Sequence, residues 1–420
     1  MVNMSRNELK DKIFQEIDNL EKVMIDSLCS IVRFEAVSPH HGGQGEEAKA
    51  QQISKIIDEQ GLSEGAKLEW IRIPDEKSQT GNRPSIILYC PGKTQQRLWM
   101  LCHIDVVSAG DRILWNTDPF EPLVKDGRVY ARGASDNGQA GIAMLYALKA
   151  LKNLNITPEY EICLGFVADE ETGSRYSIEP MVNKKIIDFR KNDMILVPDG
   201  GKSAGDFIQI AEKGLLQIEF NVYGKQCHAS TPDLGINACR VANMLSVMLD
   251  EALHKSFPDC DELFTPANST FEPTRRYANV ASVNVIPGVE KLSFDCRVLP
   301  HINLDGVIET VEKVMKSVMS QTGANVELNV LSRHDAAPCT SHDSAVAKLL
   351  SKAVSEVLNV KPRFGGVGGG TFSVFFRHEG ISSIVWEQNV DGQAHQPNEY
   401  ALIKYMLNNA KVFALMMVGW

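Results

Sequence analysis

Four nearly continuous apolar runs in the first half of the sequence constrain its fold most strongly. Such runs are typical of strands that are buried on both faces, as in a parallel sheet with helices on each side. A helical pattern, GQAGIAMLYALKALKNL, follows the second run, with Asp136 and Asn137 as expected capping residues. Strands that alternate with helices predict an α/β fold with a mostly parallel sheet. The four runs are residues 84–90, 97–104, 160–168 and 193–198.

A long amphipathic helix is predicted before these strands, and the α/β pattern returns near the end of the chain. From Leu9 to Ile31, apolar side chains recur every three or four residues. After about Ala336, the same kind of pattern resumes. These segments predict one domain made of residues 1–212 and 336–420. Its later elements are expected to be a helix over 343–358, a strand over 381–386 and a C-terminal helix over 398–417.

The pattern changes at about Lys213, which predicts a second domain inserted into the first. The segment LQIEFNVYG alternates apolar and polar residues, as in a strand with one solvated face. From residue 213 to 335 the expected order is strand, helix, strand, strand, helix, strand, which is that of a ferredoxin-like α+β unit. Its helices are expected over 237–256 and 305–320, and its later strands over 280–286, 290–298 and 325–331.

Length and charge narrow the class of protein. A chain of 420 residues should form about two or three domains, and 44% hydrophobic residues exclude a mostly disordered chain. The net charge of −10, with no basic run, disfavours binding to nucleic acid or to an anionic membrane. The N-terminus lacks an apolar signal core, and the longest uncharged apolar stretch, residues 137–148, is about half a membrane span. We therefore expect a cytoplasmic enzyme that acts on small molecules.

Histidines and carboxylates follow the predicted buried strands. In an open α/β sheet, ligands bind beyond the carboxyl ends of the strands, so side chains from five separated segments should meet there. Alone, His103 could be a core histidine, Asp136 a helix cap, and Glu170 with Glu171 a solvated loop pair. Their joint placement favours a shared site. Its expected members are His103, Asp105, Asp136, Glu170, Glu171, Asp199 and His395.

Two histidines with several carboxylates and no cysteine suit a hydrolytic site for two divalent metal ions. Imidazole and carboxylate are ordinary ligands of Zn²⁺ and also suit Co²⁺ or Mn²⁺. Positions i and i+2 of a strand share a face, so Asp105 can accept the second ring N–H of His103. Of Glu170 and Glu171, one can bind metal while the other moves protons. Metals roughly 3.5–4 Å apart need a bridging carboxylate.

The motifs along the chain together resemble those of the M20 family of metallopeptidases and deacylases. This group includes acetylornithine deacetylase, succinyl-diaminopimelate desuccinylase, aminoacylase-1 and the glutamate carboxypeptidases. The resemblance extends from about Leu9 to the C-terminus, and the motifs follow the family's order. They are HIDVV, RGASDNGQAG, ADEETGS, PDGG, KQCHASTPDLGINA, NVIPG, GGGT and AHQPNEY.

The resemblance implies a role for each residue of the predicted metal site. The implied ligands are His103 and Asp199 for one metal, Glu171 and His395 for the other, and Asp136 as the bridge. The peptide bond from Asp136 to Asn137 is typically cis in this family. Glu170 resembles the general base. Residues 1–212 and 336–420 would then be the two parts of a catalytic domain.

The inserted domain resembles the family's lid and dimerisation domain. In it, His228 matches a histidine that reaches a neighbouring active site and stabilises an oxyanion, which implies a homodimer. Taken alone, His228 would be an exposed loop histidine and Arg297 a surface ion-pair residue. The positions that match holders of the substrate's carboxylate and backbone are Asn284, Arg297, Gly370 and Thr371.

The sequence departs from the family pattern at two places. Asn137 stands where many members have a second aspartate, and Arg175–Ser177 lack a glycine that many members carry. Neither position is an implied metal ligand, so we expect both to affect specificity rather than activity.

The reaction implied is hydrolysis of an amide bond in an N-acyl amino acid or short peptide with a free carboxylate. The alternative is a dipeptidase or carboxypeptidase of the same family, which would share the chemistry. An inactive binding protein on this fold would be expected to lose ligands or the base, and all are present here. A pyridoxal-phosphate transferase would need a Schiff-base lysine in a phosphate-binding context, which the sequence lacks.

Overall fold

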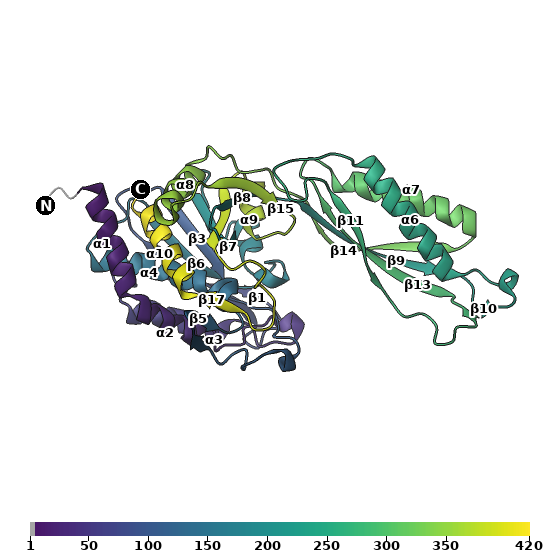
Figure 1. Ribbon diagram of the computed structural model, residues 1–420, viewed down its shortest axis with the longest axis horizontal. Coiled ribbons are helices and arrows are strands. Elements are labelled where there is room, and N and C mark those ends of the chain that lie inside the picture. The colour runs from purple at the N-terminus through teal and green to yellow at the C-terminus, as the bar shows by residue number, and fades with distance from the viewer. Residues whose placement is uncertain (1–4) are drawn as a thin grey trace. The chain divides into compact units, whose positions relative to one another are not determined.

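The computed structural model describes residues 5–420 of the chain, and these residues divide into two structural units (Figure 1). The first unit runs to Ile210 and resumes at Cys339–Gly365 and Thr371–Trp420. The second unit comprises Ala211–Pro338 and Gly366–Gly370. Residues 1–4, which the predicted first segment of the catalytic domain includes, lie outside the described residues.

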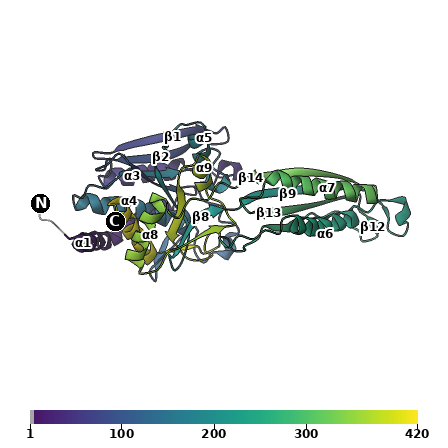
Figure 2. The ribbon, with the colours of Figure 1, turned by 90° about the horizontal axis from the view of Figure 1, so that it is seen from above.

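The first unit is built on an eight-stranded sheet. In spatial order its strands are β1 (Lys67–Pro74), β2 (Asn82–Cys90), β6 (Glu161–Val167), β3 (Arg97–His103), β7 (Met194–Lys202), β16 (Ser383–Gln388), β8 (Phe207–Glu212) and β15 (Arg363–Val367). The four strands from β6 to β16 run parallel, whereas β2 is antiparallel to both neighbours and β8 to β16. Figure 2 shows β1 and β2 side by side along one edge. The predicted α/β fold with a mostly parallel sheet is therefore confirmed.

Helices cover both faces of this sheet, which explains why its central strands read as continuous apolar runs. Every residue of β3 is buried. Trp99 packs in one core cluster with Met181 and Phe376, from two short helices, while Cys102 lies on the opposite face near Gly141. The helices of this unit are α1 (Arg6–Asn19), α2 (Glu21–Ile31), α3 (Glu47–Glu59), α4 (Gln139–Asn153), α5 (Ile178–Asn183), α8 (Ala345–Leu358), α9 (Ser373–His378) and α10 (Ile403–Met417).

The prediction of a single long helix from Leu9 to Ile31 is wrong. The segment forms two helices, α1 and α2, that meet at Leu20, whose N–H bonds to the carbonyls of Glu16 and Ile17. Buried residues occur on both sides of this break, including Ile17 and Met24. The apolar spacing continues across the break, so periodicity could not reveal it.

The predicted caps of α4 are also wrong. The helix begins at Gln139, and no side chain caps its N-terminus. Asp136 and Asn137 lie one turn earlier with non-helical backbone angles. The Asp136 side chain instead contacts His103, and the Asn137 side chain contacts Asp199. A polar group that makes these contacts is not available to cap the helix.

The second unit contains a four-stranded antiparallel sheet with two helices on one face (Figures 1 and 2). In chain order its main elements are β9 (Gly214–Tyr223), α6 (Ala238–Ser256), β11 (Thr270–Arg276), β13 (Val289–Val298), α7 (Leu304–Thr322) and β14 (Asn325–His334). The spatial order β11-β13-β9-β14 is that of a ferredoxin-like sheet. Phe220 of β9 and Phe294 of β13 meet edge-to-face in the core that joins sheet and helices.

The strand predicted over 280–286 is mostly absent. Only β12 (Val285–Ile286) forms there, and it pairs with β10 (Cys227–His228) rather than with β13. The partners of β13 are β9 and β11, and the sequence of β11, TFEPTRR, is exposed except near Phe271. An edge strand with so little apolar character gives no periodic signal, which is why it was missed.

Three short strands of the first unit form a separate sheet, β17 (Tyr400–Leu402), β5 (Arg128–Tyr130) and β4 (Leu123–Lys125). This sheet joins the segment before Asp136 to the segment after His395. Among the described residues, the helices are too short or too polar to cross a membrane.

Candidate metal centre

The carboxyl ends of the four parallel strands carry the residues predicted to form the site. His103 is the last residue of β3, and Asp199 lies towards the end of β7. Glu170 and Glu171 form a 3-10 turn just after β6, and His395 lies in the loop after β16. Asp136 precedes α4. Because the strands are parallel, their ends meet at one edge of the sheet, and the structure brings these side chains together there.

The two oxygens of Asp136 face two different histidines. Oδ1 lies 2.9 Å from Nε2 of His103, and Oδ2 lies 3.3 Å from Nε2 of His395. The same nitrogen of each histidine also lies near a second carboxylate. Nε2 of His103 is 3.5 Å from Oδ1 of Asp199, and Nε2 of His395 is 3.1 Å from Oε2 of Glu171. The peptide bond between Asp136 and Asn137 is cis.

These side chains fit divalent metal ions. Two groups, His103 with Glu170 and Asp199, and His103 with Asp136 and Glu171, each place their potential ligand atoms within 4.8 Å of one another. Imidazole nitrogen and carboxylate oxygen are the donors that zinc, cobalt and manganese accept. Asp136, whose two oxygens each lie near a different histidine nitrogen, has the placement that a bridging ligand needs.

The electrostatics of the cluster favour bound cations. Burial, and next the charge of Asp199, raise the pKa of Glu170 well above its usual value. Burial also raises the pKa of Glu171 and that of Asp199. Hydrogen bonds to Asp136 and then to Glu171 raise the pKa of His395 to about 10. Carboxylates therefore outnumber the positive charges that balance them, and a metal ion that displaces the histidine protons would restore that balance.

Asp105 accepts hydrogen bonds both from His103 and from the 3-10 turn that carries Glu170 and Glu171, which is called the glutamate turn below. Nδ1 of His103 lies 3.0 Å from the carbonyl oxygen of Asp105 and 3.5 Å from its carboxylate, so the carbonyl is the nearer acceptor for the ring N–H. The carboxylate instead accepts the backbone N–H groups of Glu170 and Glu171, at 3.1 and 3.0 Å. This arrangement leaves Nε2 of His103 directed to the carboxylates, where it could bind a metal ion.

Glu399 is a buried residue of this region that the sequence argument missed. Its Oε1 accepts the backbone N–H groups of Ser135 and Asp136, at 2.9 and 3.0 Å. Its Oε2 accepts the N–H of Gly133 at 3.2 Å and Nη1 of Arg132 at 2.6 Å. One carboxylate therefore holds the loop that carries Asp136. Its signal in the sequence is its place in the motif AHQPNEY.

Asn137 also has a role that the sequence argument did not find. It is buried, and its Nδ2 donates to the carbonyl of Pro198 at 2.7 Å and to Oδ1 of Asp199 at 3.1 Å. An aspartate at this position has no N–H to donate to either acceptor. The departure from the family pattern therefore acts on the orientation of Asp199, in addition to any effect on specificity.

The chain matches a known family of metal-dependent hydrolases. The sequence profile described as Peptidase family M20/M25/M40 matches residues 99–418, which include every residue of the cluster. The chain belongs to peptidase family M20/M25/M40. A relative named as an uncharacterized metallohydrolase of Methanocaldococcus jannaschii is 36% identical over 406 residues, 94% of this chain and 98% of the relative. The M20 chain is therefore a metal-dependent hydrolase.

Other similar proteins have lower sequence identity to this chain. Succinyl-diaminopimelate desuccinylase of Nautilia profundicola is 29% identical over 320 residues, which cover 76% of this chain and 82% of that enzyme. The structure of human carnosine dipeptidase 1 has a TM-score of 0.72 at 18% identity, covering 98% of this chain and 99% of its own. The M20 metallo-carboxypeptidase of Sulfolobus solfataricus has a TM-score of 0.74 at 19% identity, covering 94% and 99%. Identities this low establish a shared fold and no more.

The predicted substrate-contacting residues are divided between the two units of the M20 chain. His228, Asn284, Arg297 and Gly370 belong to the second unit, whereas Thr371 belongs to the first. His228 is exposed, and its Nδ1 lies 2.8 Å from Oγ of Ser230. Their roles toward substrate remain predictions.

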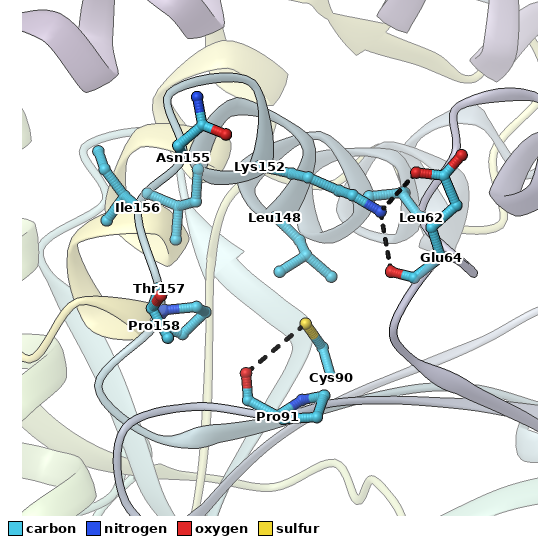
Figure 3. Close-up of a pocket in the computed structure, with 11 residues that line it drawn as sticks. Leu62, Glu64, Cys90, Pro91, Leu148, Lys152, Asn155, Ile156, Thr157 and Pro158 are labelled. Atoms are coloured by element: carbon cyan, nitrogen blue, oxygen red, sulfur yellow. Dashed lines mark hydrogen bonds and ion pairs between the residues drawn. The ribbon is translucent and has the colours of Figure 1, made fainter.

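A separate cavity of about 310 Å³ lies at the other end of the sheet (Figure 3). It is bordered by the segment just before β6 and by the end of β2, which runs antiparallel to β6. Figure 3 shows the amine of Lys152 directed at Glu64, which it contacts through the carbonyl oxygen at 2.9 Å and the carboxylate at 3.5 Å. Its lining includes neither histidine nor aspartate, so the metal centre is the better candidate for catalysis.

We expect Glu399→Gln to weaken metal binding by about 10–100-fold, the usual effect of losing a group that orients a ligand. Each oxygen of Glu399 accepts two hydrogen bonds. In glutamine an NH₂ group replaces one of these oxygens, and it cannot accept a hydrogen bond from the two donors there. Zinc affinity would be measured by competition with a chelator. Glu159→Gln, at a partly exposed residue that pairs with Lys93, is the control. Wild-type affinity in Glu399→Gln would contradict the role of Glu399.

Proposed function

We propose that this M20 protein is a two-metal amidohydrolase that removes the acyl group from an N-acyl amino acid or short peptide with a free carboxylate. The observation that carries the proposal is the position of Asp136, whose two oxygens face His103 and His395 separately. The proposed ligands are His103 and Asp199 for one metal and Glu171 and His395 for the other, with Asp136 between them. Zinc is the metal that this donor set favours most, with cobalt and manganese as alternatives.

Glu170 is proposed as the residue that moves the proton. It is next to Glu171, but among the described residues no hydrogen bond or ion pair joins its carboxylate to a histidine nitrogen, unlike the carboxylates of Asp136 and Glu171. Bound metal ions would supply Lewis acidity and lower the pKa of water at the site. Glu170 takes a proton from the attacking water and returns it to the leaving amine. Its raised pKa, caused by burial, suits a group that must both accept and donate.

The free carboxylate of the substrate is assigned to Arg297. This side chain is about one-third exposed, and it lies on β13 in the second unit. Nε and Nη2 donate to Asp295 at 2.7 and 3.2 Å, and Nη1 donates to the carbonyl of Gly368 at 2.9 Å. A guanidinium has five N–H donors, so two remain for a bound carboxylate. Asn284, Gly370 and Thr371 are proposed to hold the rest of the substrate.

The second unit is proposed to act as a lid and as the interface of a homodimer. In this proposal His228 stabilises the oxyanion in a neighbouring site. Asp105 supports the reaction indirectly, because it holds the turn that carries Glu170 and Glu171. The desuccinylase named among the relatives favours a deacylase. The dipeptidase and carboxypeptidase among the similar structures support the alternative of a peptidase, which would use the same metal centre.

We expect hydrolysis to depend on metal. Exhaustive chelation should abolish activity, and Zn²⁺, Co²⁺ or Mn²⁺ should restore it, because the cluster of carboxylates and histidines is built for cations. The assay is a screen of N-acetyl and N-succinyl amino acids alongside dipeptides, with each metal supplied in turn. Turnover of the acylated amino acids over the dipeptides supports the deacylase. Full activity in protein shown to be free of metal would overturn the two-metal proposal.

We expect Glu170→Gln to lower kcat by about 10²–10⁴-fold, which is the usual contribution of a positioned acid–base group. Metal content and fold should not change, since the amide keeps the size of the side chain. The matched variant is Glu171→Gln at the adjacent position, which should instead lower metal occupancy. Metal analysis and steady-state kinetics separate the two effects. Wild-type kcat in Glu170→Gln with metal bound would assign the base elsewhere.

We expect His228→Ala to leave metal content unchanged and to lower kcat by about 10²–10³-fold, the usual loss on removing one oxyanion donor. Mixed dimers of His228→Ala with Glu170→Gln should regain activity, because one site would combine an intact Glu170 with an intact His228 from its partner. Co-expression followed by light scattering and kinetics tests this. Mixed dimers that form but remain inactive would show that His228 does not act between subunits.

A further inference from the structure

A buried arginine on β2 lies among three buried carboxylates that the proposed chemistry does not use. Arg83 is fully buried, and its Nε and Nη2 both donate to Glu46, with Nε at 2.7 Å from Oε2. Its Nη1 lies 3.4 Å from Oδ2 of Asp75 and 3.3 Å from Oδ1 of Asp169. A buried arginine loses much of its hydration, so it is stable only if such partners surround it.

Asp169 connects this arginine to the turn that carries Glu170 and Glu171. Its backbone has a positive φ of 66°, in the left-handed region. One carboxylate oxygen accepts the hydroxyl of Thr172, and the other accepts the backbone N–H of Tyr176 at 2.9 Å. Its carbonyl accepts the N–H of Ser174 at 2.6 Å. The chain from residue 169 to 176 therefore folds around the Asp169 side chain.

The glutamate turn is thus held from two sides. From one side, the carboxylate of Asp105 accepts the backbone N–H groups of Glu170 and Glu171. From the other side, Asp169 accepts donors from within the turn and from the residues after it, and Arg83 fixes Asp169 in place. Hydrogen bonds to a buried carboxylate are charge-assisted and have defined geometry, so they can hold a side chain to within the tolerance that catalysis needs.

We propose that Asp169, anchored by Arg83, is a positioning residue that sets the placement of Glu170 and Glu171. The inference rests on the proposed roles of these two glutamates. It assigns to Asp169 no contact with substrate. Its effect is on the direction of the Glu170 carboxylate and on the ligand geometry of Glu171, because both side chains leave the backbone of the turn that Asp169 organises.

Asp75 offers a matched control for this proposal. It contacts the same nitrogen of Arg83, at 3.4 Å, and it is buried to a similar extent. Its other contacts are with His40, at 3.3 Å, and with the backbone N–H of Lys77, at 3.0 Å. Within residues 5–420, the hydrogen bonds and ion pairs of the Asp75 side chain do not directly involve the turn from 169 to 176.

The test compares Asp169→Asn with Asp75→Asn in the full-length, metal-loaded enzyme. In Asp169→Asn, an amide replaces one of two oxygens that accept donors from the turn. We expect kcat to fall by about 10–10²-fold with KM within about threefold, because placement of Glu170 affects the reaction more than binding. The visible absorption spectrum of the Co²⁺-loaded protein should also change, since Glu171 is a proposed ligand. Asp75→Asn should keep the wild-type spectrum and a kcat within about threefold.

Thr172→Val keeps the test decisive if Asp169→Asn does not fold. It removes only the hydroxyl that donates to Asp169 and should lower kcat by about 3–10-fold with a smaller spectral change. Urea unfolding of every variant measures general stability. Equal losses of kcat in Asp75→Asn and Asp169→Asn would overturn the proposal, as would an unchanged spectrum and kcat in both turn variants. Failure of the wild-type enzyme to hydrolyse any substrate would instead contradict the proposed function, and the Co²⁺ spectra would still test the positioning.

Discussion

Repulsion between partly buried carboxylates is the constraint on which the rest of this molecule depends. Asp136, Glu170, Glu171 and Asp199 meet at the carboxyl ends of four parallel strands, and His103 and His395 lie between them. Burial and mutual repulsion raise the pKa of most of these carboxyl groups, so the cluster needs added positive charge. Protons on the two histidines can supply positive charge, and bound metal ions can supply more of it. Membership of the M20/M25/M40 family agrees with the second source.

Three fully buried carboxylates accept hydrogen bonds from the loops around this cluster. Asp105, Asp169 and Glu399 lie in three separate segments, and each accepts backbone N–H groups from a loop that carries a site residue. Buried polar groups must be hydrogen-bonded to be stable, and a carboxylate can satisfy several donors at once. The loops at the site therefore have defined conformations without regular secondary structure. This explains how residues from five segments can reach positions within a few ångströms of one another.

Whether a helix or strand could be predicted from the sequence depends on the physical signal that its residues carry. The strands β3, β6 and β7 were predicted within one or two residues at most ends, because burial on both faces leaves an apolar run. The junction at Leu20 was missed because apolar spacing continues across it. The edge strand β11 was missed because its residues are mostly exposed and polar. Elements with buried faces were predictable from periodicity, and breaks and exposed edges were not.

The sequence by itself determined the α/β class and the family, because ordered motifs and buried apolar runs are local properties of the chain. It also indicated which histidines and carboxylates follow the strands, since a parallel sheet brings such positions to one edge. Only the tertiary structure decided how these side chains face one another. The two-sided placement of Asp136, the hold of Glu399 on its loop and the link from Arg83 through Asp169 all join residues far apart in sequence. Contacts of this kind depend on packing and burial, which local patterns do not encode.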